Sequence, residues 1–303
     1  MRKFMSWLVL AAKGLAMGAA NVIPGVSGGT IAFMTGIYKE LVDSLKAIDA
    51  QAVKLFFTGK FKEFWKKING NFLLAVFAGV VISIFSLAKL MQYLLETHPI
   101  QIWSFFFGLI LVSTAFIMKD LGKFTFKNAL SFLVGAGLGV FICIATPATT
   151  PDSMLFIFLC GAITFCTMIL PGISGSFILL LLGKYAYMLE AVGELKIVIL
   201  LVFAVGAAVG LVCFSHFLSW LLKKHYNATL SLLCGLMFGS LLKVWPWKET
   251  LATGTDRPLW PGQYAGDPQL ASAIIWMLVG AALIAAITLA ANRTKKKEKK
   301  LEE

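Results

Sequence analysis

Pro24-Gly25-Val26-Ser27-Gly28-Gly29 returns as Pro171-Gly172-Ile173-Ser174-Gly175-Ser176, and both strings interrupt long apolar segments. Proline stops the preceding helix, glycine permits backbone angles closed to other residues, and serine can cap the helix that follows. Each string therefore predicts a helix that stops and restarts within an apolar environment. In a membrane, the backbone groups freed by such a break are tolerated only inside the protein or beside a wet cavity.

The sequence around the two strings repeats along the chain. Near the strings, matching residues of the two halves are 147 positions apart, which pairs Asp43 with Glu190. Further along the chain they are 127 positions apart, which pairs Lys89 with His216. The change in offset predicts an insertion in the first half, within the Lys-rich stretch 50–70. We therefore predict a duplicated unit of about 150 residues. The units are a first repeat at 1–150, a second repeat at 151–292 and a basic tail at 293–303, together forming one membrane domain.

The composition places the chain in a membrane. Hydrophobic residues make up 59% of the 303 residues and charged residues only 14%, which is incompatible with a soluble domain of this size. We expect an all-α integral membrane protein. Apolar runs long enough to span a bilayer occur near 72–95, 101–118, 128–146, 197–222, 228–243 and 271–291. Two further apolar regions, 4–47 and 154–193, contain the interrupting strings and predict helical hairpins, either fully crossing or re-entrant.

The distribution of basic residues predicts the orientation. With the N-terminus inside, the loops assigned to the cytoplasm carry 18 Lys and Arg, and the opposite loops carry four. This bias favours both termini in the cytoplasm of a multi-pass protein. Each half comprises an interrupted hairpin, which returns to its own side, plus three spans. Because three crossings are odd, the second half must be inverted relative to the first, an architecture common in secondary transporters.

The two breaks are candidate anion sites. A restarting helix presents unpaired amides and the positive end of its dipole, and phosphate is a common guest there. We expect one phosphate to be shared by Ser27 and Ser174, although two sites used in turn remain open. The alternative is an ordinary pair of tight hairpin turns. The candidate phosphate-binding residues are Gly25, Ser27, Gly28, Gly29, Thr30, Gly172, Ser174, Gly175 and Ser176.

The two strings and their flanks also carry a family resemblance. KGLAMGAANVIPGVSGGT at 13–30 with GIYKEL at 36–41, and MILPGISGS at 168–176 with LGKY at 182–185, closely resemble the bacterial polyprenyl-phosphate transporter family. The resemblance covers nearly the whole chain. It implies a flippase of the bacterial cytoplasmic membrane that returns undecaprenyl phosphate from the outer to the cytoplasmic leaflet for reuse in cell-envelope synthesis. Many family members carry Asp where this chain has Asn21.

Other polar residues in the apolar regions are candidates for coupling or for a substrate entrance. Asp43 and Glu190 match across the repeat, as do Lys89 and His216, and ionisable residues inside membranes commonly mark ion pathways. Coupling to protons or another ion is one role for them, and solvated helix ends or interfacial cations are the simpler alternative. The candidates are Asn21, Glu40, Asp43, Glu190, Lys89 and His216.

Several function classes are disfavoured. The five cysteines form no CxxC pair and lack histidines at ligand spacing, so we expect no metal and no cofactor. The chain has only three arginines and no clustered catalytic groups, which argues against a phosphatase or other enzyme. The net charge of +12 follows from the cytoplasmic bias and does not indicate nucleic-acid binding. A transporter of a small anion, such as phosphate or a carboxylate, remains the alternative to a lipid transporter.

Overall fold

The computed structural model describes residues 2–22, 27–121, 125–251 and 256–302, and these residues are almost entirely helical. The predicted all-α fold is confirmed. The chain begins with α1 (Arg2–Val22), α2 (Gly28–Met34), α3 (Tyr38–Lys46), α4 (Ala50–Phe57), α5 (Phe61–Lys67), α6 (Gly70–Thr97), α7 (Pro99–Asp120) and α8 (Phe126–Ile144). It continues with α9 (Met154–Ile169), α10 (Gly175–Leu181), α11 (Tyr185–Gly193), α12 (Ile197–Lys224), α13 (Tyr226–Gly239), η1 (Ser240–Leu242), β1 (Lys248–Thr250), β2 (Asp256–Pro258), η2 (Pro261–Gln263) and α14 (Leu270–Glu302).

Local sequence signals explain where several helices begin. The Ser27 side chain accepts a hydrogen bond from the backbone of α2, and the Thr125 side chain caps α8. Ser153 caps α9 in the same way, and Pro99 occupies the first turn of α7, where its missing amide is not needed. These starts separate long apolar runs into distinct helices.

Several helices suit a bilayer by length and composition. Among the described residues, Pro99–Lys119, Phe126–Ile144 and Ile197–Lys224 satisfy both criteria as single helices, and two bent helix pairs satisfy them when each pair is taken as one span. Large apolar side chains on these and neighbouring helices face outward, including Phe85 with 83% exposure. The chain is therefore a multi-pass membrane protein.

The second motif lies at the turn of a hairpin formed by α9 and α10. The amide of Ala148 donates to the Leu181 carbonyl at 2.9 Å, and the Thr150 hydroxyl donates to the Leu182 carbonyl at 2.7 Å. The end of α10 thus lies beside the segment that precedes α9. The 16 residues of α9 rise about 24 Å at 1.5 Å per residue, short of a hydrocarbon core of about 30 Å. By length, α9 alone is therefore too short to cross the hydrocarbon core.

Glycines bring helices into close pairs, and the pairs recur at matching positions. A Cβ on Gly14 of α1 would collide with the carbonyl of Val76 on α6, and the matching Gly161 of α9 would collide with Phe203 on α12. A Cβ on Gly108 of α7 would meet Met277 on α14, and one on the matching Gly235 of α13 would meet Phe132 on α8. The small residues allow backbones to approach, as is common between membrane helices.

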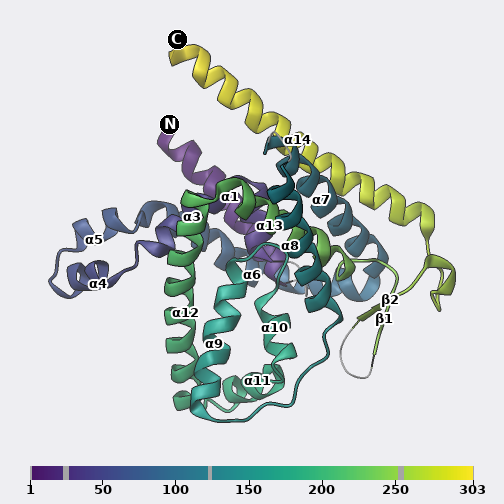
Figure 1. Cartoon of the computed structure of the whole chain (residues 1–303), viewed down its shortest axis with the longest axis horizontal. Helices are drawn as coiled ribbons and strands as arrows, with labels where there is room; N and C mark the ends of the chain where they lie inside the picture. The colour runs from purple at the N-terminus through teal and green to yellow at the C-terminus, as the bar shows by residue number, and fades with distance from the viewer. Residues whose placement is uncertain (1, 23–26, 122–124, 252–255, 303) are drawn as a thin grey trace.

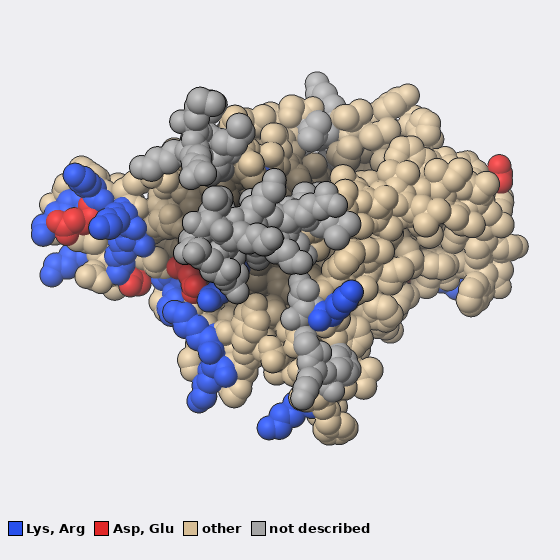
Figure 2. All heavy atoms as spheres, turned by 90° about the horizontal axis from the view of Figure 1, so that it is seen from above, with Lys and Arg blue, Asp and Glu red and all other residues tan. Residues whose placement is uncertain are grey.

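Two peripheral features lie away from the helix pairs. The helices α4 and α5 project at the left of Figure 1, while the antiparallel hairpin of β1 and β2 lies at the right. In Figure 2 the Lys and Arg side chains gather mainly over the left-hand projection, and most of the remaining described surface in that view carries no charge. The wide uncharged surface fits contact with lipid.

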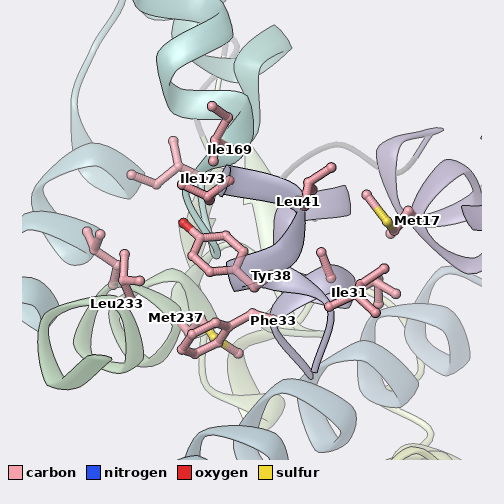
Figure 3. Packing of buried hydrophobic residues seen from close by; sticks show 14 of the residues in the cluster. Met17, Ile31, Phe33, Tyr38, Leu41, Ile169, Ile173, Leu233 and Met237 are labelled. Carbon is pink, nitrogen blue, oxygen red and sulfur yellow. The ribbon is translucent and has the colours of Figure 1, made fainter. Parts of the chain in front are cut away.

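The main hydrophobic core surrounds the short helices α2 and α3. It brings Ile31 and Tyr38 together with Ile169 and Ile173 of the second hairpin and Met237 of α13 (Figure 3). Residues near both motifs thus belong to one packed cluster, which holds the two breaks in a fixed relation.

Candidate functional site

The two breaks, far apart in the sequence, meet in the structure. The Ser27 hydroxyl donates to the Met168 carbonyl at 3.2 Å. In the other direction, the amide of Gly172 donates to the Thr30 hydroxyl at 2.8 Å. A Cβ on Gly29 would lie 2.5 Å from the Ile169 carbonyl oxygen, so only glycine allows this approach. Residues of the two motifs therefore form one continuous, buried site.

The first break is closed by hydrogen bonds within the protein. The amide of Gly28 donates to Asn21 Oδ1 at 2.6 Å, and the amide of Gly29 donates to the Ser27 hydroxyl at 3.0 Å. The amide of Thr30 donates to the Ser27 carbonyl at 2.9 Å. The expectation that these three amides are unpaired is therefore wrong, because the preceding helix and the capping serine supply their acceptors. The predicted ligand Gly25 falls in 23–26, outside the described residues.

The second break differs from the first. Gly172 adopts a φ of 86°, a conformation that favours glycine, and this turns the chain after Pro171. The Ser174 and Ser176 hydroxyls lie 2.9 Å apart and contact each other. Within the described ranges, the amides of Gly175, Ser176 and Phe177 have no hydrogen-bond acceptor. The start of α10 therefore retains the donors that an anion requires.

Tyr38 is a candidate site residue that the sequence reasoning missed. Its side chain is buried, and its hydroxyl has no hydrogen-bond partner within the described part of the chain. Figure 3 shows that this hydroxyl points toward Ile173, in the middle of the second motif. An unpaired buried hydroxyl costs free energy unless a ligand or water satisfies it. In the sequence, Tyr38 could have been noticed in the Gly-Ile-Tyr run at 36–38, which directly follows the first hairpin arm.

A second group of residues missed by the sequence reasoning lies beside the second break. Lys243 and Lys248 both contact the carboxylate of Asp256, at 2.9 Å and 3.5 Å. Burial and then the nearby charge of Lys243 lower the pKa of Lys248, and against the opposing effect of Asp256 the result is about 8. Burial alone would raise the pKa of Asp256, but the two lysines hold it below its ordinary value. In the sequence, this pair could have been noticed because it lies in a loop on the side of the membrane to which few basic residues are assigned.

The candidates for coupling or entrance are spread over the protein. Asp43 of α3 is half-buried and accepts a 2.6 Å hydrogen bond from Ser219 of α12, whereas its match Glu190 is exposed and pairs with Lys196 at 2.6 Å. Glu40 accepts from Asn69 at 2.9 Å, His216 contacts the Val212 carbonyl at 2.9 Å, and the Lys89 side chain lies outside the described residues. Of the five candidates whose side chains the structure describes, only Asn21 makes a hydrogen bond to a motif.

The comparisons with known proteins cover both breaks. Residues 17–258, which contain both motifs, match the model of the VCA0040-like family, described as undecaprenyl phosphate translocase-like. The chain belongs to this family. Membership identifies it as a transporter and not an enzyme, as the sequence predicts. No solved structure gives a significant match to the chain.

Two relatives agree with this assignment. A polyprenyl-phosphate transporter of Vibrio cholerae is 43% identical over 98% of this chain and 99% of its own length. A polyprenyl-phosphate transporter of Staphylococcus aureus is 32% identical over 77% of this chain and 84% of its own length. The likeness to the Vibrio protein extends from end to end, so it covers both breaks and the strand hairpin.

Proposed function

We propose that this protein translocates undecaprenyl phosphate from the outer to the cytoplasmic leaflet of the bacterial cytoplasmic membrane for reuse in cell-envelope synthesis. The observation that carries the proposal is the junction of two interrupted hairpins, whose second break presents amides that have no acceptor among the described residues. A phosphate monoester carries one to two negative charges near neutral pH, which these amides can bind. The names of both relatives support the choice of a polyprenyl phosphate.

In this proposal the phosphate binds at the second break before it reaches the first break. Ser174, Gly175 and Ser176 surround it with backbone amides and hydroxyls, Gly172 forms the turn that precedes them, and Tyr38 adds a donor from the first half. At the first break, the same phosphate is bound by Ser27, Gly28, Gly29 and Thr30. This binding follows when the Asn21 side chain gives up its hydrogen bond with the amide of Gly28. Because the same amide can serve Asn21 or a phosphate oxygen, Asn21 acts as a resident acceptor that the substrate replaces.

We also propose that the two halves, 1–150 and 151–292, have inverted orientations and alternately open this junction to either leaflet. The matching glycine contacts support a repeated architecture: Gly14 with Val76 corresponds to Gly161 with Phe203. The 18-to-four bias of Lys and Arg supports cytoplasmic termini. A proton or another ion can drive the cycle, with Asp43 as the most enclosed of the candidate carboxylates.

The proposal predicts transport by the purified protein alone. In proteoliposomes, undecaprenyl phosphate should lose accessibility in one leaflet and gain it in the other, faster than in protein-free liposomes. Accessibility is measured with a membrane-impermeant phosphatase, with and without a proton or sodium gradient. Uptake of radiolabelled inorganic phosphate is measured in parallel. Uptake of free phosphate without movement of the lipid would support the small-anion alternative and contradict the proposal.

Replacement of Tyr38 tests the placement of the phosphate at the second break. Removing a hydrogen bond to a charged group costs about 1.5 to 3 kcal/mol, so Tyr38→Phe should weaken binding of undecaprenyl phosphate about ten- to a hundredfold. Tyr185→Phe is the matched control, because Tyr185 occupies the equivalent position in the second half but is partly exposed. Affinity is measured by lipid titration in nanodiscs. Equal affinities of Tyr38→Phe and the unsubstituted protein would remove Tyr38 from the site.

A further inference from the structure

The lysine cluster beside the second break is enclosed and carries excess positive charge. The Lys243 and Lys248 side chains are only 8% and 10% exposed, and both contact the same Asp256 oxygen. Within the described residues, no second carboxylate contacts either ammonium group. The Thr250 hydroxyl donates to the other Asp256 oxygen at 2.9 Å, which fixes the carboxylate. Two buried cations therefore share one anion, and such an excess is costly without a further negative partner.

Aromatic rings form the walls of this cluster but do not neutralise it. Lys243 Nζ lies 4.2 Å from the centre of the Phe177 ring, and Lys248 Nζ lies 3.4 Å from the centre of the Trp103 ring. Ring faces attract cations through their quadrupole and carry no net charge. The cluster can therefore still accept an anion.

The cluster directly borders the second break. Phe177, which contacts Lys243, follows Ser176 and lies in the first turn of α10. A Cβ on Gly172 would lie 2.9 Å from the hydroxyl oxygen of Ser240, three residues before Lys243. A group released by the lysines would therefore be adjacent to the amides of the second motif.

An apolar cavity is lined by chain neighbours of the lysine cluster. Its volume is about 490 Å³, and its lining comes from α7, α8, α13, η1 and the segment after β2. Leu242 and Trp245, on either side of Lys243, belong to this lining, as does Leu259, close to Asp256. Phe107 and Trp245 pack edge to face with ring centres 5.4 Å apart. An elongated apolar group could occupy this space while a charged end reaches the lysines.

We propose that Lys243 and Lys248 form a second headgroup site, which receives the phosphate of a polyprenyl phosphate while its first isoprene units occupy the apolar cavity. This assignment rests on the proposed function. Asp256 compensates one of the two buried positive charges, and the phosphate compensates the other. Under the orientation proposed above, the site faces the outer leaflet and precedes the second break in the transport direction. The phosphate then moves past Phe177, from the ammonium groups of the two lysines to the backbone amides of the second break.

The test is lipid binding to the full-length protein in nanodiscs, measured by native mass spectrometry with three probes: undecaprenyl phosphate, uncharged undecaprenol and inorganic phosphate. Lys243→Gln and Lys248→Gln should each weaken undecaprenyl phosphate binding by at least about tenfold, since each removes a charged hydrogen-bond donor. Either substitution leaves one lysine paired with Asp256, so no isolated buried charge remains. Binding of undecaprenol should be unchanged.

Two controls separate a specific site from general effects. Arg257→Gln removes one positive charge from the same loop, but its side chain is exposed, and we expect wild-type affinity. Lys243→Arg retains the charge and should retain most of the affinity. Trp260→Ala should weaken binding of the lipid but not of inorganic phosphate, which separates recognition of the tail from recognition of the headgroup.

The outcomes also separate this inference from the proposed function. Wild-type affinity in both glutamine variants, or an equal loss with Arg257→Gln, would overturn the lysine site even if the protein transports the lipid normally. Equal losses for undecaprenol would likewise overturn it, because they would show a general loss of structure. If lysine-dependent lipid binding is present but the unsubstituted protein moves no lipid in proteoliposomes, the headgroup site stands and the proposed transport fails.

Discussion

Valine at Gly29 is expected to reduce lipid transport by at least about a hundredfold, because displacements near 1 Å in a site can already have effects of this size. The added Cβ would lie 2.5 Å from the Ile169 carbonyl oxygen and 3.1 Å from that of Met168. Both atoms belong to backbone, which cannot rotate away as a side chain can. The two breaks would have to separate, and the hydrogen bonds between them would be lost. Transport is measured in proteoliposomes containing equal amounts of folded protein.

Gly137→Val provides the matched control for this substitution. Gly137 also lies in a membrane helix, α8, but a Cβ there meets nothing within 4 Å. The control should transport at the wild-type rate, and size-exclusion profiles should show that both variants remain monodisperse. Wild-type transport by Gly29→Val would mean that the contact between the breaks is unnecessary for function.

Two cysteines, each introduced into a different loop, are each expected to be labelled from one side of the membrane only. Cysteine at Lys60, in the projection that contains α4 and α5, should react with an impermeant maleimide only from the cytoplasm. Cysteine at Gly262, in the segment between β2 and α14, should react only from outside, because the sequence bias assigns the two loops to opposite sides. Both positions are exposed in the structure. Reactivity is measured in intact cells and in inverted vesicles.

The unsubstituted chain is the control for the labelling experiment. Its cysteines lie in helices α8, α9, α12 and α13, and three of the five are buried. Background labelling should therefore be low from either side. Reaction of positions 60 and 262 from the same side would contradict the inverted arrangement of the halves, although the helices themselves would be unaffected.

Much of the fold could be predicted because its signals are local. Long apolar runs and the residues that interrupt them predict the helices, and Pro24 and Pro171 mark the two breaks. Ser27 and Ser153 occupy the capping positions expected of serine. The contact of the end of α10 with residues 148–150 was not predictable, because it depends on packing between segments that are not adjacent in the sequence.

The details of the site were less predictable because they depend on packing between distant segments. The serines and glycines of the motifs do come together, as in Ser27 with Met168 and Thr30 with Gly172. The sequence did not reveal that Asn21 already occupies the amide of Gly28. That hydrogen bond depends on how α1 and α2 pack against each other.

Lys243 and Lys248 illustrate a further limit of sequence reasoning. Basic residues in a loop are ordinarily solvated, and nothing in their spacing distinguishes a buried pair from an exposed one. Their burial results from the antiparallel pairing of β1 with β2, which brings Asp256 over both ammonium groups. Only the folded loop shows that two cations share one carboxylate.

The close helix pairs have a consequence for how the chain can be divided. Two of the four glycine-mediated pairs, α7 with α14 and α8 with α13, join a helix from residues 1–150 to one from 151–292. A polypeptide ending near residue 150 would keep α1 with α6 but would leave α7 and α8 without their partners. Residues 1–150 and 151–292 therefore depend on each other for these helix contacts. In the duplication that the sequence predicts, one copy of the unit could complete these contacts only by associating with a second copy, as the subunits of a symmetric dimer do.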